Sequence, residues 1–168
     1  MKKLFVMLFA VATSNTAFSQ GKDVVDIAIG SKDHTTLVAA VKAADLVNTL
    51  KGKGPFTVFA PTNAAFDKLP AGTVDDLLKP ENKAQLAKIL TYHVVSGNID
   101  AAGVGAAIKS GNGKAVLTTV SGGKLTVSMD MGKVKLTDES GNSAYVTAAD
   151  LKGSNGVVHV IDGVLLPR

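Results

Sequence analysis

The chain has 168 residues, of which 46% are hydrophobic and 19% are charged, and this composition is typical of one packed globular domain rather than a disordered chain. It contains no cysteine, which excludes disulfides, thiolate metal sites, a cysteine nucleophile and lipid attachment to an N-terminal cysteine. The formal net charge of +4 includes two lysines at the very start of the chain.

Residues 1–19 have the features of a secretory signal peptide. Lys2 and Lys3 form a basic start, residues 4–12 (LFVMLFAVA) are apolar, and small residues precede position 20 at the spacing that signal peptidase needs. We therefore predict cleavage after Ser19, one domain over residues 20–168 and a secreted or periplasmic product. A retained membrane anchor is the alternative, but the apolar run is much shorter than the roughly 20 residues that span a bilayer.

The charge balance changes when this leader is removed. Of the 18 Lys and Arg, 16 remain without Lys2 and Lys3, and these nearly match the 14 Asp and Glu. The remaining cations are mostly spread singly along the sequence, so no basic stripe suited to a phosphate backbone is visible. We predict no nucleic acid partner and, after signal cleavage, no transmembrane segment.

The front half of the domain has helical periodicity around one strand. Apolar residues recur at steps of three and four from Leu37 to Leu50, which predicts one helix of about four turns that ends at Gly52. His34 lies in a polar stretch before this helix and is expected to be exposed. Residues 56–60 (FTVFA) form a β-branched and aromatic run, which predicts a buried strand.

Three further helices are expected after this strand. Thr62 offers an N-cap hydroxyl for a short helix over residues 63–69, and another short helix is expected over 74–78. A longer amphipathic helix is predicted over residues 82–92. Its apolar face continues to His93, so we expect this side chain to point inward.

The back half of the domain has the alternation of strands. Beyond Gly97 the hydrophobic period is two. Glycine-containing turns at residues 122–123, 131–132 and 140–142 separate the runs, which predicts an antiparallel meander of hairpins. Residues 157–161 (VVHVI) are apolar on both faces except for one histidine, so they are expected to form a central strand.

Three stretches resemble signature motifs of the fasciclin (FAS1) domain family: residues 56–66 (FTVFAPTNAAF), residues 92–95 (YHVV) and residues 155–167 (NGVVHVIDGVLLP). They occur in the family's order and at similar spacing, and the resemblance covers about residues 21–167. It implies an α+β fold, a FAS1-like β-wedge of two sheets with flanking helices. It also implies a secreted adhesion or interaction module without enzymatic activity or an obligatory cofactor.

The polar residues of these motifs have a structural interpretation. Thr62 and Asn63 follow a strand and a proline, where side-chain oxygens can cap the amides of the next helix. Asn155-Gly156 and Asp162-Gly163 are turn dipeptides, in which the polar side chain commonly bonds local backbone. We therefore predict that these residues, together with His159, fasten the fold rather than contact a ligand.

Two of the histidines, His93 and His159, lie in apolar runs, and no carboxylate stands at metal-site spacing to either. We predict neutral, hydrogen-bonded core histidines, because burying a charged ring is costly. The alternative is a functional pair that holds a metal or transfers protons.

No catalytic pattern was found in the sequence. No serine has a nucleophile-elbow motif, no phosphate-binding P-loop occurs, and no catalytic, cofactor-binding or metal-binding residue is predicted. Asp75-Asp76 and Asp138-Glu139 are adjacent carboxylates that we interpret as solvated surface. Residues 138–142 also resemble a calcium loop faintly, without the ligand alternation of an EF-hand.

The predicted contact face comes from the family resemblance. Recognition by animal members is linked to the Tyr-His region and to an Asp-Ile pair before the last motif. Here Tyr92 and His93 match the first element, and Asp150-Leu151 stands at the second with leucine in place of isoleucine. The expected partner is a cell-surface or matrix protein or a glycan. The alternative function is a periplasmic carrier or enzyme that holds a small ligand in a cleft between wedge and helices.

Overall fold

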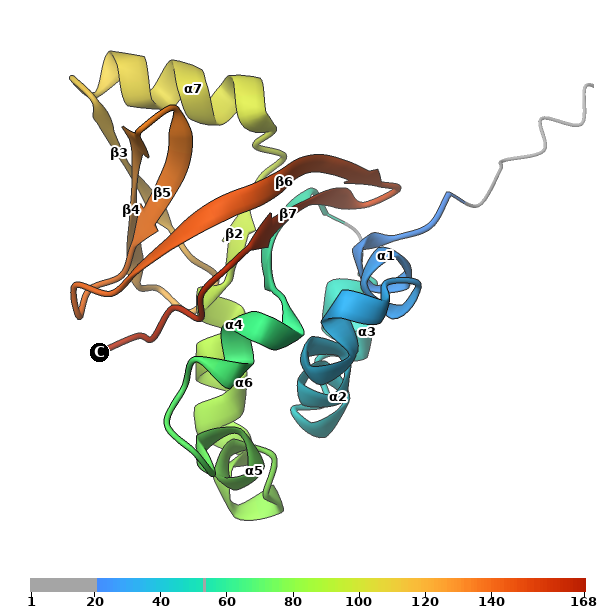
Figure 1. Cartoon of the computed structure of the whole chain (residues 1–168). Coiled ribbons are helices and arrows are strands. Elements are labelled where there is room, and N and C mark those ends of the chain that lie inside the picture. The colour runs from blue at the N-terminus through green and yellow to red at the C-terminus, as the bar shows by residue number, and fades with distance from the viewer. Residues whose placement is uncertain (1–20, 53) are drawn as a thin grey trace, which may run out of the picture.

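The computed structural model describes residues 21–52 and 54–168 (Figure 1). The predicted signal peptide lies outside these residues. Among the described helices, none is both long and apolar enough to cross a membrane. In chain order the elements are α1 (Val24–Ile29), η1 (Lys32–His34), α2 (Thr35–Ala43), α3 (Val47–Leu50), β1 (Phe56–Pro61), α4 (Asn63–Asp67), α5 (Thr73–Leu77), η2 (Pro80–Asn82), α6 (Lys83–Tyr92), β2 (Val94–Ser96), α7 (Ala101–Ser110), β3 (Lys114–Thr118), β4 (Lys124–Asp130), β5 (Lys133–Thr137), β6 (Ser143–Gly153) and β7 (Gly156–Ile161).

The single helix predicted up to Gly52 is wrong, because the chain breaks it into α2 and α3. Asp45 between them has φ of +58°, a left-handed conformation that aspartate tolerates better than most residues. Leu37 in α2 and Leu50 in α3 are nevertheless both buried in the same core cluster. The apolar stripe therefore predicted the buried face correctly but not the break.

The expected exposure of His34 is also wrong. Its side chain is only 5% exposed, because the residue ends the 3-10 turn η1 that leads into α2. The ring nitrogen Nδ1 lies 2.8 Å from the hydroxyl of Ser31, the residue that caps this turn. Burial lowers the pKa of His34.

Two helices were absent from the sequence-based prediction. Helix α1 begins with a capping box between Asp23 and Asp26. Helix α7 is N-capped by Asp100, whose Oδ1 accepts a hydrogen bond of 2.8 Å from Gly103 N. Its buried residues Val104 and Ile108 are four apart, so one narrow apolar stripe among small residues was the signal that was missed.

The strands form one mixed sheet in the order β2-β1-β7-β6-β5-β4-β3. Neighbours are antiparallel except β1 and β7, which pair in parallel from Phe56 opposite Gly156 onward. The predicted meander runs from β3 to β7, and the predicted central strand β7 is buried along its whole length. The α+β class is confirmed.

Strand β6 joins the two halves of the sheet that form the wedge (Figure 1). Its first residues pair with β5, whereas residues from Val146 to Gly153 pair with β7, with register shifts on both sides of Ala148. An isolated bridge between Val95 and Thr119 links β2 to the end of β3, so the sheet nearly closes into a barrel. The two sheets of the predicted wedge are therefore continuous through β6.

The core has two parts. One lies between the helices and the first strands and includes Leu37, Val58 and Ile89. The other lies inside the wedge and includes Tyr92, Leu125, Val127, Leu136, Ile161 and Leu165, all fully buried. The signature motifs border both parts.

Candidate functional site

The first signature motif joins the starts of two helices. Thr62 Oγ1 accepts a hydrogen bond of 3.2 Å from Ala65 N and thereby caps α4. Asn63 Oδ1 accepts from Thr36 N at 3.0 Å in the first turn of α2, and its Nδ2 donates to Lys32 O at 3.1 Å. Thr62 caps the next helix, as its position suggested, whereas the partners of Asn63 lie in earlier segments rather than in the next helix, so Asn63 links α4 to η1 and α2.

Tyr92 in the second motif connects α6 to the meander. Its hydroxyl donates to Lys124 O at 2.6 Å and accepts from Glu139 N at 3.3 Å. The residue is 0% exposed, and burial raises its pKa. Gly123 packs directly on the ring, because a Cβ there would lie 2.6 Å from Tyr92 Cε2.

His93 connects α6 to the C-terminal segment. It is 2% exposed, its Nδ1 donates to Ile89 O at 2.8 Å, and its Nε2 accepts from Leu165 N at 3.0 Å. These partners require a neutral ring with its proton on Nδ1. Burial lowers the pKa of His93 to about 4, in agreement with the predicted neutral core histidine.

This pKa makes stability depend on pH. The unfolded chain binds a proton at His93 near pH 6.5, whereas the folded chain binds it only near pH 4. Stability should therefore fall by about 3 kcal/mol as the pH decreases from 6.5 to 4, with a further contribution of the same sign from His34. Urea titrations at pH 7, 5.5 and 4 would measure this.

The carboxylate of Asp26 provides an internal comparison for these titrations. Its pKa is lowered by the hydrogen bond from Lys51. The stability that the ionised carboxylate contributes is therefore lost only when the pH falls below the ordinary pKa of 3.8. The two effects are thus separated in pH. Equal stability at pH 7 and pH 4 would contradict the assignment of His93 as a buried neutral ring.

His159 lies in β7, with both ring nitrogens bonded to backbone. Nε2 donates to Ile99 O at 2.8 Å, Nδ1 accepts a long hydrogen bond of 3.4 Å from Asp150 N, and the ring stacks on Phe59 with centroids 5.6 Å apart. His93 is likewise bonded at both nitrogens. Neither ring has a lone pair to offer a metal or a substrate, so the geometry does not favour the functional-pair alternative.

Asp162 bonds across the sheet rather than to its own turn. Its Oδ1 accepts from Tyr145 N at 2.8 Å, and its backbone N donates to Tyr145 O at 3.1 Å. The side chain thus extends the β6–β7 ladder past the end of β7. The predicted structural role agrees with this geometry, although the predicted local partner was wrong.

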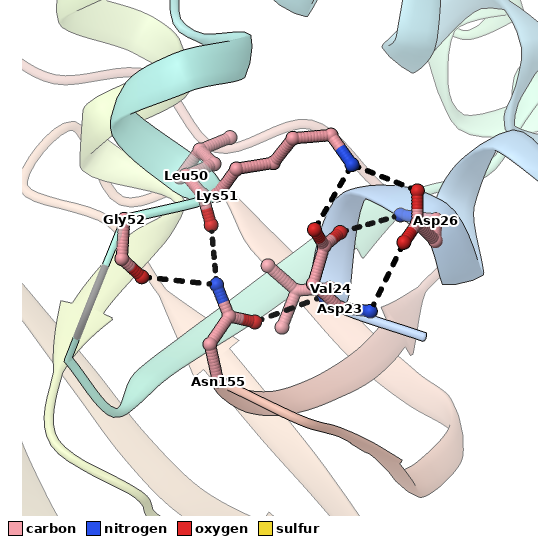
Figure 2. Close-up of polar contacts among 7 residues, drawn as sticks. All are labelled: Asp23, Val24, Asp26, Leu50, Lys51, Gly52 and Asn155. Atoms are coloured by element: carbon pink, nitrogen blue, oxygen red, sulfur yellow. Dashed lines mark hydrogen bonds and ion pairs between the residues drawn. The ribbon is translucent and has the colours of Figure 1, made fainter. Parts of the chain in front are cut away.

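Asn155 holds three separate segments together (Figure 2). Its Oδ1 accepts from Val24 N at 3.0 Å, while its Nδ2 donates to Leu50 O at 2.6 Å and to Gly52 O at 3.3 Å. Beside it, Lys51 Nζ contacts carboxylates of both capping-box residues of α1, at 2.9 and 2.8 Å. The tip of the β6–β7 hairpin is therefore fixed to α1 and to the end of α3.

The solvated-surface interpretation of Asp138 is wrong. Its side chain is buried at 6% exposure, and four N–H groups reach its two oxygens, from Ser140 N, Asn142 N, Asn142 Nδ2 and Leu166 N at 2.8–3.0 Å. A carboxylate surrounded by donors is a poor cation ligand. Over the described part of the chain, no group of three or more His, Asp or Glu side chains could hold a metal.

The predicted contact face does not form as one surface. Tyr92 and His93 are buried, so neither side chain can touch a partner directly. Asp150, with φ of +59°, uses its Oδ1 to accept from Ala101 N at 2.8 Å at the start of α7. Leu151 is 38% exposed, and its contact with a partner stays a prediction.

The space between the helices and the wedge is too small to hold a ligand. The apolar cavity lined by α1, α2, α3 and β1 has about 30 Å³, whereas ligand sites hold roughly 300–1,000 Å³. A larger, open groove of about 500 Å³ lies beside the β6–β7 hairpin, between Lys51, Asn98 and Ser154. This groove has no signature in the sequence, because it brings together glycine-rich loops far apart in the chain.

Comparisons with known proteins agree with this geometry. The family model of the fasciclin domain matches residues 32–167. The chain is 51% identical over 158 residues to protein sll1483 of Synechocystis, with 94% of this chain and 81% of the relative covered. It is 39% identical over 123 residues to the cell surface glycolipoprotein MPB83 of Mycobacterium bovis, with 73% and 48% covered.

A solved structure has the same fold at low sequence identity. The FAS1 domain pair of the insect cell adhesion molecule fasciclin I superposes with a TM-score of 0.61 at 20% identity. The match covers 77% of this chain and 43% of that one. With these matches and the three signature motifs in their expected places, the chain belongs to the fasciclin (FAS1) domain family.

Proposed function

We propose that the protein is an exported, non-catalytic adhesion module that binds a cell-surface or matrix protein or a polysaccharide. The observation that carries this proposal is the use of the polar signature side chains inside the fold. Asn63, Tyr92, His93, Asn155 and Asp162 each bond backbone groups of distant segments. Recognition then belongs to exposed surface, as in adhesion, rather than to a polar cleft.

The names of two similar proteins support the same proposal. One relative is named as a cell surface protein, and the solved neighbour belongs to a cell adhesion molecule. Export of this chain is proposed from the signal-peptide features of residues 1–19. Sequencing the N-terminus of the protein collected outside the cytoplasm should give Gln20, and an intact Met1 would contradict cleavage.

A cell-binding measurement tests the function. Fluorescently labelled protein should bind whole cells of the source organism, or their extracellular material, saturably and in competition with unlabelled protein. Heat-unfolded protein provides the control for non-specific adsorption. Absence of saturable binding to both preparations would contradict an adhesion role.

Leu151→Ser tests the remaining part of the predicted contact face. Leu151 is 38% exposed, so this change should leave the fold intact and weaken binding if the side chain touches the partner. Asp150→Ala is less informative, because it also frees Ala101 N at the start of α7. Unchanged binding of Leu151→Ser at unchanged Tm would remove Leu151 from the contact.

A further inference from the structure

The strands of the meander have one face directed away from the core. On β4 and β5, Leu125, Val127 and Leu136 are fully buried, so the alternate residues point to the opposite side. We call this side the outer face; it consists of Lys114, Val116, Thr118, Lys124, Thr126, Ser128, Asp130, Lys133, Lys135, Thr137, Ser143 and Tyr145. These residues lie in rows across four strands, because directly paired residues share a face.

The rows combine lysines with hydroxyl groups. One row runs from Lys114 through Ser128 and Lys135 to Tyr145. The next row on one side contains Val116, Thr126, Thr137 and Ser143, and the row on the other side pairs Asp130 with Lys133. Strand spacing places Lys114 about 10 Å from Lys135 at the backbone and Lys133 about 7 Å from Lys135.

Positive charge predominates on the outer face. Four lysines stand against one carboxylate, that of Asp130, in a domain whose charges otherwise nearly balance. Lys124 lies at the edge, where its backbone N bonds the carboxylate of Glu139 at 2.9 Å. Among the described residues, Lys114 and Lys133 form no ion pair, whereas Lys135 lies 3.7 Å from Asp130.

Tyr145 holds the one aromatic ring of this face in a fixed orientation. Its hydroxyl donates to Asp130 Oδ2 at 2.8 Å, and Lys135 Nζ lies 6.0 Å from the ring centroid. Asp130 is therefore occupied within the face. What remains for a partner is the two lysines without a carboxylate, Lys114 and Lys133, the hydroxyl of Ser128 in the row of Lys114, and the hydroxyl of Thr126 in the neighbouring row.

We propose that the outer face binds an acidic polysaccharide, a sugar chain that carries carboxylate or sulfate groups. This inference rests on the proposed function and names its ligand class. Lysines spaced across an exposed sheet face complement charges repeated along an extended chain, and the hydroxyls beside them can exchange hydrogen bonds with sugar hydroxyls. Val116, at 60% exposure, is an apolar side chain within a face that otherwise consists of polar and charged residues.

Other polyanions fit this surface less well. A membrane surface would favour a broad apolar patch beside the lysines, whereas the outer face has Val116 singly among Thr and Ser, with Met131 exposed at the adjoining β4–β5 turn. A nucleic acid would favour a denser row of cations along its backbone. These two partners are kept as outcomes of the test.

The test compares two variants with the same change in net charge. Lys114→Gln/Lys133→Gln/Lys135→Gln alters the outer face, and Lys32→Gln/Lys42→Gln/Lys83→Gln alters exposed lysines of the helical side. Binding of the purified protein to polygalacturonate and to dextran sulfate is measured at several salt concentrations, with neutral dextran, duplex DNA and phosphatidylglycerol vesicles as comparisons. Tm is recorded for each variant.

We expect binding to at least one acidic polysaccharide, weakening with salt, to fall at least tenfold in the outer-face variant and less than twofold in the helical-side variant. Equal losses in both variants would overturn the proposal, because net charge alone would then explain binding. Tighter binding to DNA or to vesicles would overturn it in favour of that partner. If the outer-face variant still binds cells like the unmodified protein, this inference fails while the adhesion proposal stands.

Discussion

Replacing Gly156 by alanine is expected to destabilise the fold by more than about 4 kcal/mol and to prevent accumulation of folded protein. An alanine Cβ would lie 1.9 Å from Phe56 O and 2.8 Å from Phe56 N. Both atoms are backbone of β1, held in register by the parallel pairing of Phe56 with Gly156. The clash cannot be relieved without separating the two parallel strands β1 and β7.

Gly105→Ala provides the matched control for this change. Gly105 lies inside α7, and nothing lies within 4 Å of the position of its Cβ. Alanine there should raise stability by about 0.5–1 kcal/mol, because it favours helix and restricts the unfolded chain. Urea unfolding followed by circular dichroism measures both variants, with protease resistance for any that fails to fold. A folded Gly156→Ala variant with unchanged midpoint would contradict the close approach of β7 to β1.

Replacing His93 by alanine is expected to cost about 4 kcal/mol and to lower Tm by about 10 °C. The change leaves a cavity beside Ile89 and removes the acceptor of Leu165 N, in a residue that is fully buried. Since the neutral ring also carries the acid sensitivity, stability between pH 6.5 and 4 should depend less on pH in this variant. Thermal and urea unfolding at both pH values measure the two effects.

Gln85→Ala is the control on the same helix. Gln85 lies on the exposed side of α6, and its replacement should change stability by less than about 0.5 kcal/mol. Cell binding is measured in parallel with both variants. A His93→Ala protein that keeps native Tm and loses partner binding would show that His93 acts in recognition rather than as a buried fastener.

The parts of the fold that were predicted correctly depend on short-range patterns. The strand at residues 157–161 was evident because apolar residues occupy both faces, and Gly122, Gly132 and Gly141 marked the hairpin turns, where each has positive φ. Thr62 was identified as a cap by its position between a strand and a helix. Period and turn chemistry are local properties, so one sequence suffices to recognise them.

The errors concern burial that arises from distant contacts. Asp138 looked solvated beside Glu139, but Leu166 N reaches it from the C-terminal segment. His34 looked exposed in a polar stretch, yet the fold covers it. The sequence around Asp45 contains no helix-stop signal that would have predicted the end of α2 before it. A polar residue with a distant partner has no periodic signature in its own neighbourhood.

The same division between local patterns and distant contacts applies to the candidate site. The structural role of the signature motifs was predictable from their turn and cap chemistry, whereas the partners of Asn155, on α1 and α3, were not. The resemblance placed Tyr92 at a contact face, whereas its ring is buried and its hydroxyl bonds the backbone of Lys124 and Glu139. The outer face became visible only when pairing aligned residues from four strands.

Strand β6 gives hydrogen bonds to β5 at its beginning and to β7 along the rest of its length. Because one continuous strand serves both halves of the wedge, neither half can open without stripping partners from the other. We therefore expect the amides of β4 and β7 to exchange as parts of one cooperative unfolding unit. A ligand held on the meander would accordingly slow hydrogen exchange in the parallel strands at the far side of the sheet.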